Sequence, residues 1–207
     1  MYFMLLESHQ KTLMTRQYGV IARWQLLGTG FTERQVDRRV NLARFLPLCR
    51  GIYVLPFTEP TWERLCVGAW LFGADRRYPS ALSHVTAAAI HGFPGFERRG
   101  TPQLIASRGD RHPNPLAIVT RRSDLGADDL MCHPSGALLT TPARTAVDLL
   151  MNDARPGRAE DTLRRILRSG VVTHDEIARR FLPMATQFRA GTAHVRPLLF
   201  PRSEAAA

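Results

Sequence analysis

With 207 residues, an apolar fraction of 44% and a formal net charge of +10 at pH 7, the chain has room for one large domain or two modest ones with real cores. The excess of cations favours an anionic partner, nucleic acid first. Cys49, Cys66 and Cys132 are odd in number and widely spaced, which argues against a disulfide framework and a zinc site and fits a reducing cytoplasm. Residues 2–6 form a short apolar run without a basic lead-in, so neither a signal peptide nor a membrane span is expected.

The first predicted helix lies near the N-terminus. Leu5, Leu6, His9 and Leu13 recur at helical spacing, and Tyr18 follows them. We expect this helix to pack beneath the next two helices and to complete a three-helix core.

The next stretch predicts two helices joined by a tight turn. Ile21, Trp24 and Leu27 have helical spacing, and Gly28-Thr29-Gly30 ends that helix, because glycine adopts the backbone angles of a sharp stop without steric cost. Thr32 is a good N-cap for a second helix. Two helices with a short glycine-containing turn between them are typical of a helix-turn-helix.

The second helix of this pair, predicted for about residues 32–44, is the best candidate for base recognition. Val36, Val40 and Ala43 fall on one face, which should be core. The opposite face carries Arg34, Arg38 and Asn41, with Gln35 at its edge. Arginine, glutamine and asparagine read base edges in the major groove through bidentate hydrogen bonds. The alternative is an ordinary solvated helix face.

A hairpin follows, with strands at residues 45–48 and 52–55 and Cys49-Arg50-Gly51 as its tip. Pro47 confines the first strand to a sheet edge, and Arg50 is placed to meet a phosphate or the minor groove. The hairpin makes the helix-turn-helix a winged one. The residues predicted to contact DNA are Arg34, Gln35, Arg38, Arg39, Asn41, Arg44 and Arg50.

Pro56 and Pro60 punctuate the chain, and a second, α/β part is predicted to begin near residue 61. Its predicted helices cover residues 62–70, 83–91, 141–150, 159–169 and 173–181, and a last short helix follows residue 189. Its predicted strands cover residues 103–107, 116–121 and 136–140. The motifs LSHVTAAAIHGF and TTPARTAVDLL belong to the second and third of these helices, with Gly92 predicted to end the second and Thr141 to cap the third.

Most polar residues of this part have a structural interpretation. His84 and His91 lack further ligands nearby, so we expect structural histidines and no metal site. Arg144 and Asp148 are four apart and predict an intrahelical ion pair.

Two arginine-rich surfaces remain in the second part. Their members are Arg98, Arg99, Arg121 and Arg122 in one, and Arg164, Arg165 and Arg168 in the other. For the second, a nucleic-acid surface, a surface for a protein toxin and a solvated face all stay open.

These motifs together carry a resemblance. The segments QYGVIARWQLLGTGFTERQVDRRV, CRGIYVLP, LSHVTAAAIHGF and TTPARTAVDLL resemble the AbiEi-type antitoxins of bacterial type IV-like toxin–antitoxin systems, over about residues 15–181. The resemblance implies an antitoxin that binds the DNA of its own operon and neutralises a cognate nucleotidyltransferase toxin. Because the active site of such a toxin offers acidic groups, we expect the arginine-rich surfaces to bind it. The same two-part head also occurs fused to a restriction-endonuclease-like tail in other proteins.

Enzymatic functions are disfavoured. A restriction-type nuclease needs a catalytic lysine beside acidic metal ligands, and the sole lysine is Lys11 in the first predicted helix. The nucleotidyltransferase pattern, a Gly-Ser turn followed by an Asp-x-Asp pair, is also absent. Asp128 and Asp129 do not replace that pair, because adjacent residues face opposite ways in a strand. There is no P-loop and no glycine-rich dinucleotide turn. We therefore expect no enzymatic activity, cofactor or metal.

The sequence thus predicts an α/β (α+β) protein: a winged helix-turn-helix at residues 1–60, then a mixed α/β domain at residues 61–207 with a helical C-terminal end. The expected partners are operator DNA and the cognate toxin, with dimerisation on DNA left open and no membrane. The alternatives are a winged-helix regulator without a toxin and a catalytically dead relic of a nuclease fusion.

Overall fold

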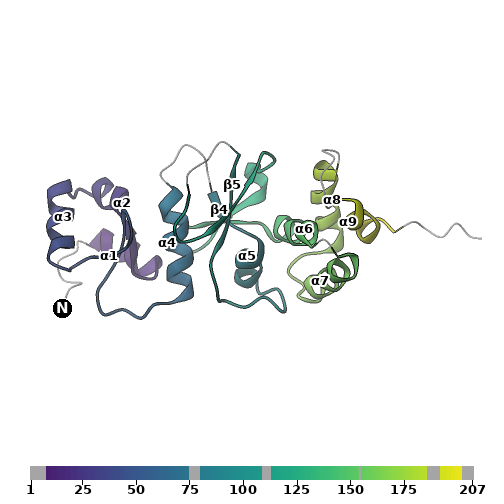
Figure 1. Cartoon of the computed structure of the whole chain (residues 1–207), viewed down its shortest axis with the longest axis horizontal. Coiled ribbons are helices and arrows are strands. Elements are labelled where there is room, and N and C mark those ends of the chain that lie inside the picture. Colours follow the sequence, from purple (N-terminus) through teal and green to yellow (C-terminus); the bar gives the residue numbers. More distant parts are fainter. Residues whose placement is uncertain (1–7, 75–79, 109–112, 154, 186–191, 202–207) are drawn as a thin grey trace, which may run out of the picture. The chain divides into compact units, whose positions relative to one another are not determined.

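The computed structural model describes residues 8–74, 80–108, 113–153, 155–185 and 192–201 of a mixed α+β protein (Figure 1). The chain divides into two compact units. The first unit comprises residues 1–82, 99–123 and 132–139, and the second comprises residues 83–98, 124–131 and 140–207.

The first unit begins with three helices and a small antiparallel sheet. Its elements are, in chain order, α1 (Ser8–Arg16), β1 (Val20–Ala22), α2 (Arg23–Gly28), α3 (Glu33–Asn41), β2 (Leu46–Cys49) and β3 (Ile52–Val54). The sheet has the strand order β1-β3-β2, with Ile21 opposite Tyr53 and Leu46 opposite Val54. Pro47 lies in the edge strand β2, as predicted, where its missing N–H leaves no gap in the ladder.

The helix predicted from Ile21, Trp24 and Leu27 begins later than expected. Val20–Ala22 forms strand β1, and α2 starts only at Arg23. All three strand residues are fully buried, so the strand lacks the apolar–polar alternation that marks a half-exposed strand. Trp24 is 37% exposed rather than in the core.

Two further details of the first unit differ from expectation. Helix α3 ends at Asn41, and Ala43 lies beyond it with φ of 51°, in the left-handed region. In α1 the buried face is set by Gln10 and Met14, whereas His9 is exposed. Leu5 and Leu6 lie outside the described residues.

The core under the first three helices gathers residues from α1, β1, α2, α3 and β3 and from the segments beside the hairpin strands. It consists of Met14, Ile21, Leu26, Val36, Phe45, Tyr53 and Leu55. A second cluster lies on the other face of β1 and consists of Val20, Ala22, Ile52, Val67 and Leu71. The last two belong to α4 (Trp62–Ala74), so this helix packs against β1 and β3.

Because of this packing, the first unit continues past the predicted boundary near Pro60. Gly68 of α4 lies so close to the hairpin that a Cβ there would stand 2.6 Å from Leu48 Cδ2. The independent folding of residues 1–60 and residues 61–207 stays a prediction.

A second sheet has five strands in the order β6-β5-β4-β8-β7. The strands are β4 (Ser80–Leu82), β5 (Gln103–Ser107), β6 (Ile118–Arg122), β7 (Leu130–Cys132) and β8 (Leu138–Thr140). Strand β5 runs antiparallel to β4 and parallel to β6, and β4 runs parallel to β8. The predicted strands at 103–107, 116–121 and 136–140 correspond to β5, β6 and β8, whereas the short strands β4 and β7 were not predicted.

The second unit is mainly helical (Figure 1). Its helices are α5 (His84–His91), α6 (Pro142–Asn152), α7 (Pro156–Arg168), α8 (His174–Ala185) and α9 (Thr192–Leu199). Helix α6 contacts the other four, and its buried side includes Ala146, Val147 and Leu150. Thr141 caps this helix as predicted, because its side chain accepts a hydrogen bond from the Arg144 backbone N–H.

Candidate nucleic-acid interface

The N-terminus of α3 is fixed by a capping box. The Thr32 hydroxyl accepts a hydrogen bond from the backbone N–H of Gln35 at 3.2 Å, and Gln35 Oε1 accepts one from the backbone N–H of Thr32 at 2.8 Å. Two backbone donors that helix geometry leaves unpaired are thereby satisfied.

An ion pair and a core contact set the rotation of α3. Val36 is fully buried, and one helical step away Asp37 Oδ1 lies 2.7 Å from Arg23 Nη1, with Glu33 3.8 Å from the same guanidinium. The hydrogen bond from Arg23 lowers the pKa of Asp37, and the same bond raises the pKa of Arg23. Helix α3 is therefore held to the first residue of α2 as well as to the core.

With that rotation, four of the predicted residues share one exposed face. Arg34, Gln35, Arg38 and Asn41 are all exposed and line one shallow hollow together with Thr32, Asp37 and Leu42. Among these four, the Gln35 amide oxygen already accepts one hydrogen bond in the cap, and its N–H groups can donate to a partner.

The other two predicted arginines of this region are half-buried. Arg39 Nη1 donates to the Gln35 carbonyl at 3.2 Å, and its guanidinium carbon lies 4.3 Å from the Phe31 ring centroid. Burial lowers the pKa of Arg39, and the charges of Arg44 and Arg38 add to that effect. Arg39 thus steadies α3, and a DNA contact from Arg39 or Arg44 stays a prediction.

The tip of the hairpin presents Arg50, which is exposed. The tip turns at Gly51, whose φ of +78° lies in the left-handed region that favours glycine. The pairing of β2 with β3 shifts its register between Pro47 and Cys49, next to this turn. The sequence correctly predicted Arg50 at the tip but gave no sign of Arg23 and Asp37, which are distant in sequence and follow no helical spacing.

The two predicted arginine-rich surfaces fare differently. Arg164, Arg165 and Arg168 line one pocket of the second unit together with Arg158. Arg98 belongs to the second unit, whereas Arg99, Arg121 and Arg122 belong to the first. A joint surface of those four residues stays a prediction.

The TTPARTAVDLL motif forms a buried charge network within the second unit. Arg144 is fully buried, and its Nε lies 2.9 Å from Asp148 Oδ2, the predicted intrahelical pair. Its Nη1 also donates to Asp129 Oδ2 at 2.8 Å, and Arg180 of α8 pairs with the same carboxylate. A further carboxylate, that of Asp124, lies 3.5 Å from Arg144 Nη2. The network joins α6, α8 and the loop before β7.

The sequence predicts neither a metal site nor a disulfide framework. The described residues hold no group of three or more His, Cys, Asp or Glu side chains placed to bind a metal ion. His91 Nε2 lies 2.8 Å from the Thr140 carbonyl, and His84 Nδ1 lies 2.9 Å from the Ser83 hydroxyl. All three cysteines are free thiols, and burial raises the pKa of Cys66 to about 12.

Comparisons with known proteins bear on the fold. No family model and no curated protein matches this chain. The crystal structure of the RV2827C protein from Mycobacterium tuberculosis is similar, with a TM-score of 0.54 and 15% sequence identity over 91% of this chain and 80% of that one. At this identity the likeness establishes a shared α+β fold. Among the described helices, none is long and apolar enough to cross a membrane.

Proposed function

We propose that this chain is a cytoplasmic, sequence-specific DNA-binding repressor whose first unit contains a winged helix-turn-helix. In this proposal α3 is the recognition helix and the β2–β3 hairpin is the wing. The element order α1-β1-α2-α3-β2-β3, with an antiparallel sheet β1-β3-β2, supports this proposal, because a winged helix also has a helix pair followed by a hairpin.

The exposed face of α3 carries the proposal. Three of the exposed side chains are those of Arg34, Arg38 and Asn41. The helix that carries them is capped by Thr32, packed into the core by Val36 and held to Arg23 by Asp37. A helix of this diameter fits the major groove, and these side-chain types match base edges there. Arg50 at the wing adds a phosphate or minor-groove contact.

We also propose that the repressor acts as an antitoxin, as the resemblance of its motifs to AbiEi-type proteins implies. Its partners are then the operator DNA of its own operon and a cognate nucleotidyltransferase toxin, and the protein has no catalytic activity of its own. The runner-up is a winged-helix regulator without a toxin partner.

Two experiments separate these functions. Full-length protein titrated against a labelled duplex from upstream of its own gene should bind more tightly than to a shuffled duplex at the same salt concentration, because base contacts add to phosphate contacts. Equal affinity for the two duplexes would contradict specific repression. Co-expression of this chain with a nucleotidyltransferase encoded beside its gene should restore the growth of cells that the nucleotidyltransferase alone arrests. If growth is not restored although the chain still binds the operator, the regulator without a toxin is favoured.

A further inference from the structure

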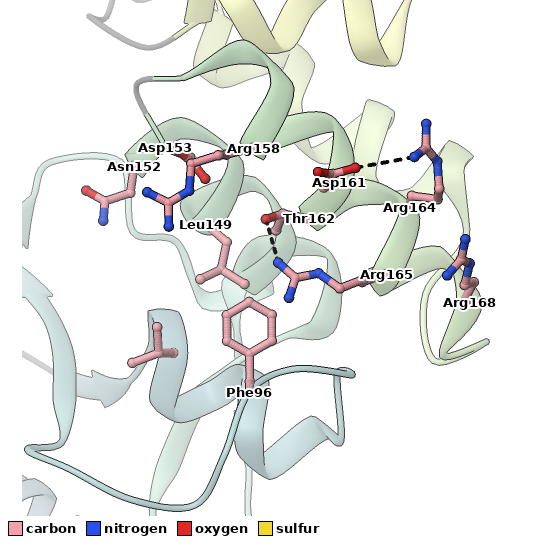
Figure 2. A pocket seen from close by; sticks show the side chains of 11 residues that line it. Phe96, Leu149, Asn152, Asp153, Arg158, Asp161, Thr162, Arg164, Arg165 and Arg168 are labelled. Carbon is pink, nitrogen blue, oxygen red and sulfur yellow. Dashed lines mark hydrogen bonds and ion pairs between the residues drawn. The ribbon is translucent and has the colours of Figure 1, made fainter.

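The second unit contains a pocket that the DNA-binding proposal does not use (Figure 2). Its volume is about 760 Å³, within the range of small-molecule sites. The walls come from α7, the end of α6, α5 and the segment after α5. Its lining is mixed: Val85, Phe96 and Leu149 are apolar, and the charged members are two carboxylates and four arginines, namely Asp153, Asp161, Arg158, Arg164, Arg165 and Arg168.

Arg165 is held in place against the pocket floor. Its Nη2 lies 3.3 Å from the Thr162 hydroxyl, and its guanidinium carbon lies 5.8 Å from the Phe96 ring centroid. A Cβ at Gly95 would stand 2.5 Å from Arg165 Nη1, so the guanidinium lies directly against that glycine. Its buried Nε–H has no acceptor among the described residues, which is a costly arrangement that an anionic oxygen would relieve.

The four arginines are not equivalent. Figure 2 shows the guanidinium groups of Arg158 and Arg165 directed toward Leu149 and Phe96, whereas Arg164 and Arg168 lie farther along α7. Arg164 is neutralised by Glu160 at 2.8 Å and Asp161 at 3.3 Å. The positive charge available to a ligand over the apolar floor therefore comes mainly from Arg158 and Arg165, and the Asp153 carboxylate, which also lines the pocket, offsets part of it.

We propose that this pocket binds a nucleotide, with its ring on the Phe96–Leu149 floor and its phosphate between Arg158 and Arg165. Guanidinium groups bind phosphate oxygens bidentately, and an aromatic ring beside an apolar side chain gives a planar base a stacking surface. The Asn152 side chain at the rim carries the amide donors and acceptor that a base edge needs.

Isothermal titration of the full chain with the four nucleoside monophosphates tests this proposal. At least one should bind with a Kd below about 1 mM, and inorganic phosphate and the matching nucleoside should each bind at least about tenfold more weakly.

Arg165→Ala and Arg158→Ala should each weaken nucleotide binding about tenfold or more. Arg179→Ala, which removes an exposed arginine of α8, should leave the Kd within about twofold. Phe96→Leu keeps an apolar side chain but removes the ring, and should weaken nucleotide binding by a larger factor than phosphate binding.

The contradicting results are equally specific. Absence of heat with every nucleotide at about 5 mM, or equal losses in the Arg165 and Arg179 variants, would overturn the site. Phosphate binding as tightly as the nucleotide would remove the ring contact from the proposal. If single-stranded oligonucleotides bind about a hundredfold tighter than any mononucleotide, the pocket is part of a surface for a nucleic-acid strand and the mononucleotide proposal is wrong. No residue of α3 takes part, so failure here leaves the repressor proposal standing.

Discussion

At the scale of single residues, Arg144 shows how one position organises the second unit. Among the described residues it is the largest fully buried side chain, and burying a guanidinium is costly unless its charge and its donors are matched. Asp148 supplies one partner from the same helix, and Asp129 and Asp124 supply the others from outside it. The network therefore ties α6 to a particular neighbouring loop.

Removing this arginine should destabilise the protein severely. We expect Arg144→Met to lower the free energy of unfolding by about 3–5 kcal/mol, because three buried carboxylates lose their shared cation. Arg164→Ala is the matched control, since Arg164 also pairs with a carboxylate four residues away, but with both side chains more than half exposed, and it should cost about 0–1 kcal/mol. Urea denaturation measures both, and equal losses would contradict a structural role for the network.

The network also predicts how stability depends on pH. Burial alone would raise the pKa of Asp129, but the hydrogen bonds from Arg180 and Gly126 and the charges of Arg144 and Arg180 outweigh it, and the pKa is lowered below 3.8. Unfolding raises that pKa, so the unfolded chain binds the proton more tightly. The contribution of Asp129 is therefore complete above the ordinary value of 3.8 and is lost as the pH falls through the depressed pKa.

Asp129→Asn should accordingly be less stable than the wild type at neutral pH. We expect the difference in urea midpoint to be constant between about pH 5 and pH 7 and to narrow below about pH 4. A difference that stays constant down to about pH 3 would show that the Asp129 carboxylate is not the stabilising species.

What the sequence predicts at this scale depends on distance along the chain. The Arg144–Asp148 pair follows from helical spacing. Asp124, Asp129 and Arg180 join it only through tertiary packing, and no spacing rule connects them. For the same reason Arg34, Arg38 and Asn41 could be placed together in advance, whereas the ion pair between Arg23 and Asp37 could not.

At the scale of elements, caps and turns were the most predictable features. Thr32, Thr141 and Gly92 each end or begin a helix as expected, because these residues act through local backbone geometry. Strand β1 was mistaken for helix, since a strand buried on both faces shows a continuous apolar run. Helix α3 ends three residues early for a local reason, the left-handed Ala43.

The hairpin offers a test of its own as an element. If Arg50 contacts a phosphate, Arg50→Ala should weaken DNA binding for all sequences alike and lower the slope of log K against log salt by about one unit. Fluorescence anisotropy at several salt concentrations, with specific and shuffled duplexes, measures both quantities. A changed sequence preference with an unchanged slope would give Arg50 a base-reading role instead.

At the scale of the whole molecule, the first unit is more continuous than the predicted boundary near Pro60 implies. Helix α4 supplies Val67 and Leu71 to a core shared with β1 and β3, and Gly68 allows the close approach to Leu48. Amphipathic spacing indicates that α4 has a buried side but does not indicate which element this side covers. The packing of α4 on β1 and β3 could therefore not be predicted from the sequence.

Filling that contact should loosen the first unit. We expect Gly68→Leu to lower the free energy of unfolding by about 1–3 kcal/mol, because the added side chain meets Leu48 and Ile52. Gly28→Leu, where a Cβ meets nothing within 4 Å, should change stability by less than about 0.5 kcal/mol. Thermal unfolding of both full-length variants makes the comparison, and a neutral Gly68 variant would mean that α4 is not part of this core.

The central claim is that α3 reads DNA, and operator affinity of the Arg38→Ala variant tests it most directly. Each arginine that reads a guanine contributes about 1–3 kcal/mol of discrimination, so full-length Arg38→Ala should bind the duplex from upstream of its own gene roughly 5- to 150-fold more weakly than the wild type. Arg179→Ala, an equal change of charge on α8, should retain wild-type affinity at the same salt concentration. Wild-type affinity in the Arg38 variant, with its circular dichroism unchanged, would contradict recognition by α3.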